Sequence, residues 1–209
     1  MFFNKLKILF ILLLVSIAVK GQKINIKIDS LKNIVNTSQE KSVIANAKIN
    51  IGKLYNNTNT DSAMVYFKSG LEIAEENNFI KYKAKAFNSI AASYIMKGKL
   101  DSSEVYFDKA KVLLPEFDDK IIIISYYGDR GILEYYKGDL QKASENFKKA
   151  LDISIEEQNI ENIIRYSNNS ALTLSKIGKN NESLDIYYKA LKAAEEQKDS
   201  VILECYLIT

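Results

Sequence analysis

The stretch GDLQKASENFKKA, residues 138–150, recurs in one frame forty residues earlier as GKLDSSEVYFDKA (98–110) and forty residues later as GKNNESLDIYYKA (178–190). After its opening glycine, each copy spaces a small residue, an aromatic residue and a second small residue four and then three positions apart. Residues four and seven apart share one face of an α-helix. The pattern therefore predicts a helix face that packs against a neighbour, because small side chains let a backbone approach and the ring fills the remaining space.

A fourth copy of the spacing precedes these three, so the frame extends over most of the chain. The first small positions are Ala63, Ser103, Ala143 and Ser183, the aromatic positions are Phe67, Phe107, Phe147 and Tyr187, and the second small positions are Gly70, Ala110, Ala150 and Ala190. Each series advances by forty residues without a slip. We predict that these twelve residues pack between helices.

A second helix is expected before each copy, as in KAKAFNSIAASYIMKG (83–98). Gly98, Gly138 and Gly178 should end such helices, and Pro115 should stop the helix of the second copy. The unit is then helix, tight turn, helix, loop, and only stacked units can bury both faces of each pair. The predicted repeats are 42–78, 79–118, 119–158 and 159–197, with a lead segment at 22–38 and a partial fifth repeat at 198–209.

Residues 39–209 resemble tetratricopeptide repeats. The residues of the second copy that fall on signature positions of that family are Phe87, Ile90, Ala91, Tyr94, Gly98, Ser103, Phe107, Ala110 and Pro115. The resemblance implies an all-α fold, a right-handed α-solenoid of antiparallel helix pairs with about four repeats and a trailing helix. The forty-residue repeat exceeds the family's usual 34, which implies longer helices. Polar residues replace the usual apolar ones at Arg130, Glu134, Ser167 and Ser170.

The resemblance also implies a concave groove lined by the first helix of each repeat. The residues carried onto that groove are Asn88, Ile95, Ile132, Tyr135, Tyr136, Arg165, Asn168 and Leu172. Arg165 and Asn168, three residues apart, would hold a peptide backbone or a carboxylate, unless Arg165 is simply solvated. Tyr135 and Tyr136 would anchor a ligand, or one of them packs against the next repeat.

The first 21 residues have the composition of a secretory signal. Two lysines precede an uncharged run at 8–19, and small residues at Val19 and Gly21 favour cleavage before Gln22. Twelve residues rise about 18 Å as a helix, short of the roughly 30 Å hydrocarbon core of a membrane. We expect an exported protein, periplasmic or membrane-associated. An uncleaved anchor is the alternative.

The remaining composition argues against catalysis and against nucleic-acid binding. Beyond the signal, basic and acidic residues balance, and we find no basic stripe. The chain has no histidine and one cysteine, Cys205, which we interpret as a small buried hydrophobe. His-based triads and the commonest metal sites therefore cannot form, and no phosphate-binding glycine loop is present. We predict a non-enzyme without a cofactor or metal whose partner is a protein or peptide.

The ends of the chain leave a second function open. The segment KDSVILECYLIT (198–209) occupies the position of a fifth repeat's first helix, and it either caps the array or belongs to a longer chain. The N-terminal part resembles the extracytoplasmic start of bacterial signalling proteins, in which such repeats precede a membrane span and a histidine kinase or a DNA-binding output domain. The alternative is therefore a sensor segment of a membrane signalling protein, with membrane contact only through an uncleaved signal or a missing C-terminal part. The sequence does not specify an oligomeric state.

Overall fold

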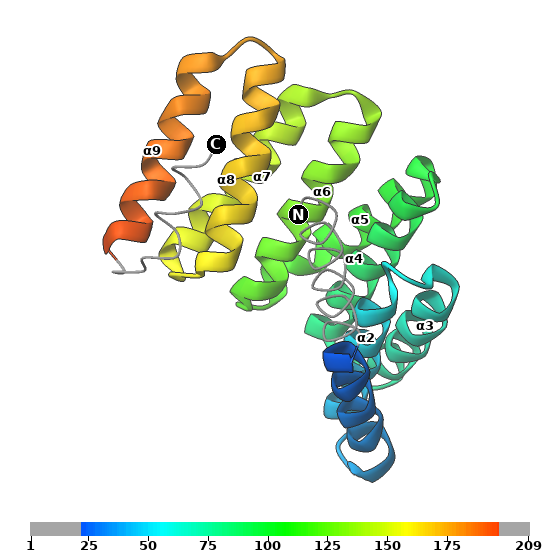
Figure 1. The fold of residues 1–209 in the computed structure, drawn as a ribbon. Coiled ribbons are helices and arrows are strands. Elements are labelled where there is room, and N and C mark those ends of the chain that lie inside the picture. Colours follow the sequence, from blue (N-terminus) through cyan, green and yellow to red (C-terminus); the bar gives the residue numbers. More distant parts are fainter. Residues whose placement is uncertain (1–21, 197–209) are drawn as a thin grey trace, which may run out of the picture. The chain divides into compact units, whose positions relative to one another are not determined.

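The computed structural model describes residues 22–196, in which every regular element is a helix (Figure 1). The all-α prediction is therefore confirmed over this range. The predicted signal at 1–21 and the partial fifth repeat at 198–209 lie outside the described residues.

A helix over 22–37 opens this part of the chain, in the predicted lead segment. The elements that follow are α2 (Lys41–Tyr55), α3 (Thr60–Glu76), α4 (Ile80–Met96), α5 (Leu100–Leu113), a 3₁₀ turn (Leu114–Glu116), α6 (Lys120–Lys137), α7 (Leu140–Glu156), α8 (Ile160–Lys176) and α9 (Asn180–Glu196). By its internal contacts the chain divides between Tyr82 and Lys83, close to the start of α4.

The first unit packs α2 against α3 through small residues. A side chain at Gly70 would come within 2.7 Å of Ile49 Cγ1, and one at Gly52 would meet the ring of Phe67. Phe67 is 1% exposed. The two glycines thus let an isoleucine and an aromatic ring fill the space between the helices.

In the second unit, α6, α7, α8 and α9 pack consecutively as antiparallel neighbours (Figure 1). One apolar cluster joins α4, α5 and α6 around Phe107, and another joins α6 to α9 around Phe147 and Leu151. Of the twelve predicted packing residues, all are buried except Tyr187, which is half-buried. On α9 the neighbouring Ile186 is buried to 6% exposure, beside Ser183 and Ala190.

Local backbone chemistry sets the helix ends. Gly98, Gly138 and Gly178 have φ angles of +67°, +83° and +79°, so they end the first helices as predicted. Pro115 lies in the 3₁₀ turn that follows α5, also as predicted. Side chains of Asn59, Asp119, Asp139 and Asn159 accept backbone N–H groups at the starts of α3, α6, α7 and α8.

Three of the four polar residues at the usually apolar positions have polar partners, whereas the buried Ser170 hydroxyl has none within residues 22–196. Arg130 of α6 pairs with Glu134 on its own helix and reaches Glu104 and Asp108 on α5, at 2.8, 3.1 and 3.2 Å. The seam between α5 and α6 therefore contains an ionic layer. Ser167 is fully buried and donates to the backbone carbonyl of Ile164, within its own helix.

Candidate ligand-binding groove

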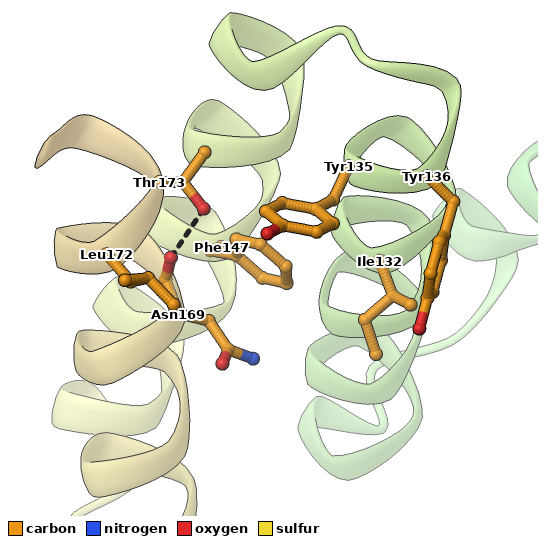
Figure 2. A pocket seen from close by; sticks show the side chains of 7 residues that line it. All are labelled: Ile132, Tyr135, Tyr136, Phe147, Asn169, Leu172 and Thr173. Atoms are coloured by element: carbon orange, nitrogen blue, oxygen red, sulfur yellow. Dashed lines mark hydrogen bonds between the residues drawn. The ribbon is translucent and has the colours of Figure 1, made fainter. Parts of the chain in front are cut away.

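A pocket of about 330 Å³ opens between α6 and α8 of the second unit (Figure 2). Its walls come from three helices: Ile132, Tyr135 and Tyr136 from α6, Phe147 from α7, and Asn169, Leu172 and Thr173 from α8. No acidic or basic side chain is among these seven residues. The pocket is thus an apolar and aromatic cleft with one carboxamide, the usual composition of a recognition site.

The rims of the pocket expose large apolar side chains to solvent. Tyr136 on α6 is 64% exposed and Leu172 on α8 is 54% exposed. Tyr135 meets Tyr136 edge to face, with ring centroids 6.0 Å apart. A partner that covers these side chains would remove apolar surface from water. Each Å² of apolar surface buried in this way contributes about 25 cal/mol of favourable binding free energy.

The floor of the pocket is a residue of the repeat seam. Phe147 is 3% exposed, and its ring lies so close to Gly131 of α6 that a Cβ there would be 2.7 Å from Phe147 Cδ1. The absence of a side chain at Gly131 therefore lets the ring approach α6. Phe147 serves both the packing of α6 on α7 and the surface of the pocket.

The polar groups of the pocket differ in whether they are already bonded. The Thr173 hydroxyl donates to the backbone carbonyl of Asn169 at 2.6 Å (Figure 2). The Asn169 side chain points into the space between α8 and α6, and it makes no hydrogen bond within residues 22–196. Lys176, one turn beyond Leu172, places its ammonium 5.8 Å from the centroid of the Tyr135 ring.

The eight predicted groove residues fall into three groups. Ile132, Tyr135, Tyr136 and Leu172 line the pocket together. Asn88 and Ile95 are buried at 2% and 9% exposure, and Asn88 donates to Asp129 Oδ2 at 2.8 Å. Arg165 and Asn168 are exposed on α8 but do not line the pocket.

Arg165 pairs with an acid on its own helix, since its guanidinium lies 2.6 Å from Glu161 Oε1. Its predicted role as a carboxylate ligand would require that pair to open. The sequence interpretation missed Asn169, Thr173 and Phe147 as pocket residues. The spacing contained a signal for Asn169, because it lies three residues before Leu172 and hence on the same helix face.

Two buried phenols lie in the second unit, and neither lines the pocket. Burial, together with the charge of Asp129, raises the pKa of Tyr166 to about 12. Burial likewise raises the pKa of Tyr126 to about 12. Both hydroxyls therefore remain protonated at neutral pH.

Between residues 22 and 196, no group of three or more acidic, cysteine or histidine side chains is arranged to hold a metal ion. Over the same range, no helix combines the length and the apolar character that crossing a membrane requires.

No protein-family model matches the sequence, and no curated protein is similar to it. Solved structures are similar in fold at low sequence identity. A Rap protein complexed with Competence and Sporulation Factor is 18% identical, with a TM-score of 0.75, and matches 88% of this chain. PlcR from Bacillus thuringiensis, in complex with a peptide and DNA, is 14% identical with a TM-score of 0.65, over 91% of this chain and 70% of its own.

The TPR-like repeats of a putative kinesin light chain from Podosopora anserina are 11% identical, with a TM-score of 0.58, over 86% of this chain and 91% of theirs. The present chain spans 53% of the length of the Rap protein. At these identities the likeness establishes the fold. The protein has the fold of the tetratricopeptide-type helical-repeat proteins, as the repeat pattern predicted.

Proposed function

We propose that this protein is a non-catalytic scaffold that binds a protein or peptide in the groove between α6 and α8. The observation that carries the proposal is the apolar pocket whose rims, Tyr136 and Leu172, are more than half exposed. Covering such side chains with a partner lowers the free energy, because it removes apolar surface from water. Two proteins of similar fold support a peptide partner, because PlcR was solved with a peptide and the Rap protein with Competence and Sporulation Factor.

The test is a selection of displayed random peptides on the full chain, followed by affinity measurements with synthetic peptides. The groove variant is Leu172→Ser, which removes one rim without touching the buried floor. Its matched control is Val112→Ser on α5, which removes a 72% exposed side chain outside the pocket. We expect the groove variant to weaken binding about tenfold or more and the control to leave it unchanged. Equal binding by all three proteins would disprove the groove assignment.

We also propose that the protein acts outside the cytoplasm. The support is the sequence of residues 1–21, with its basic start, apolar run and small residues before Gln22. Expression of the whole chain, with mass determination of the mature N-terminus, tests this. A chain that begins at Gln22 is expected, and a protein that stays in the cytoplasm with residues 1–21 attached would refute it.

The alternative, a sensor segment of a membrane signalling protein, rests on the resemblance of the N-terminal part to such proteins. Sequencing the gene beyond the codon for Thr209 tests it. A membrane span and an output domain in the same frame would support this function, and a stop codon would refute it.

A further inference from the structure

The size of the pocket limits what it can hold. At about 330 Å³ it lies at the small end of the range for sites that bury a whole drug-sized ligand. Phe147 forms the bottom of the pocket, and the packing of α6 on α7 fixes its ring in place. One large side chain and the adjoining main chain fit this description better than a folded surface or a cofactor.

The carboxamide of Asn169 selects for a particular polar group. A carboxamide offers one acceptor oxygen and two N–H donors. A peptide group presents one donor and one acceptor, so it can satisfy both sides of the Asn169 side chain at once. A hydrocarbon ligand would instead leave the carboxamide covered and unpaired, which is unfavourable.

The charges around the groove are complementary to an anion at one end. Arg165 is paired with Glu161, and Lys137 is paired with Glu104. Lys176 contacts the Tyr135 ring, and within residues 22–196 it has no acidic partner. A carboxylate near this end of α8 would gain an ion pair without breaking an existing one.

We propose that the occupant of the pocket is a polypeptide segment with one aromatic or long aliphatic side chain and a nearby Asp or Glu. The apolar side chain lies between Tyr135 and Leu172, Asn169 bonds the adjoining peptide group, and the acidic side chain pairs with Lys176. This inference rests on the proposed function, and it adds the chemistry of the ligand.

The test uses the peptides that the selection yields, synthesised with amidated C-termini so that only side-chain carboxylates are present. We expect the selected peptides to contain a large apolar residue with an Asp or Glu within about three positions of it. Over that spacing, the Lys176 side chain can reach the acidic group. Replacing the apolar residue of the peptide by Ala should weaken binding about tenfold or more. Asn169→Ala should weaken it about threefold to tenfold, as expected for one or two hydrogen bonds.

A charge exchange tests the ion pair separately. Lys176→Glu should lower the affinity for the acidic peptide severalfold. A peptide with Lys in place of the acidic residue should bind the Lys176→Glu variant with recovered affinity. The matched controls are Asn168→Ala, next to Asn169 but outside the pocket, and Lys192→Glu, an exposed lysine of α9. Neither control should change binding by more than about twofold, a change below about 0.5 kcal/mol.

The possible failures are distinguishable. Peptides that bind in the groove and lose affinity with Leu172→Ser, but lack the acid or ignore the charge exchange, would overturn the ligand assignment and leave the proposed function standing. Peptides without a large apolar residue would do the same. A selection that yields no binder at all would overturn both.

Discussion

Arg130 Nε donates to Glu134 Oε1 at 2.8 Å, one helical turn apart, in a seam that repeat proteins of this fold usually fill with apolar side chains. The Glu134 side chain is only 5% exposed and that of Arg130 is 17% exposed. Arg130 also reaches Glu104 and Asp108 across the seam, and its guanidinium lies 5.8 Å from the centroid of Phe107. The junction between α5 and α6 is therefore held by charges and by a ring together.

Removing the cation should destabilise the fold more than removing both charges of the pair. Arg130→Ala would leave Glu134 buried without its partner, which we expect to cost about 3 kcal/mol. The double variant Arg130→Met, Glu134→Leu should lie within about 1 kcal/mol of the parent protein, because apolar side chains can replace a buried pair. Urea unfolding measures both. A single variant no less stable than the double one would contradict this account.

The same layer should make stability depend on pH. The hydrogen bond from Lys137 lowers the pKa of Glu104 below its ordinary value of 4.5, and Arg130 acts in the same direction. A carboxyl group with a lowered pKa stabilises the fold above its unfolded pKa and loses that contribution as pH falls through its folded pKa. At pH values below 4.5, we expect the urea midpoint of the parent protein to decrease more steeply with falling pH than that of the Glu104→Gln variant. Glu72→Gln, an exposed site in the first unit, is the control and should keep the parent slope.

Phe107 should be a major contributor to the core of the second unit. It is completely buried and packs with Tyr126, Leu133 and Ala110. Phe107→Ala is expected to lower the free energy of unfolding by about 3–5 kcal/mol through lost burial and the cavity left behind. Val105→Ala on the same helix, where the side chain is 54% exposed, should change it by less than about 0.5 kcal/mol. Equal effects in denaturant titrations would show that the packing face is misassigned.

A larger side chain at Ala110 should also destabilise the fold, in this case by overpacking the core. It is fully buried at the second small position of the repeat. Ala110→Leu adds three carbons at this fully buried position, and about 1–3 kcal/mol of destabilisation is expected. Val112→Leu, two residues away and 72% exposed, is the control. Thermal unfolding that is unchanged by Ala110→Leu would mean that the seam has space to spare.

Gly131 should tolerate no side chain even though alanine favours helices. Gly131→Ala gains about 1 kcal/mol of helix propensity, but its Cβ would lie 2.7 Å from Phe147 Cδ1. We expect a net loss of stability, with the ring pushed toward the pocket that it floors. In a Phe147→Leu background, Gly131→Ala should cost less stability than it does in the parent protein. A Gly131→Ala variant more stable than the parent in calorimetry would refute the close approach.

Much of the architecture follows from the sequence alone. The forty-residue step, the glycines at 98, 138 and 178, and the small and aromatic positions predict helices, their ends and their buried faces. These features depend on interactions within one helix or across one tight turn, and such interactions leave a periodic trace in the chain. Four of the eight residues that the resemblance carried onto a groove, Ile132, Tyr135, Tyr136 and Leu172, line the pocket between α6 and α8.

The tertiary structure alone decided which polar side chains meet. Asn88 turned toward Asp129 and became buried, while Asn169 and not Asn168 reached the pocket. Arg130 pairs with Glu104 and Asp108 on α5 and with Glu134 on its own helix, at positions where the sequence suggested poor packing. These outcomes depend on the distance and direction of a neighbouring helix. Periodicity within one helix assigns a residue to a face, but it does not say which side chain of the next helix stands opposite.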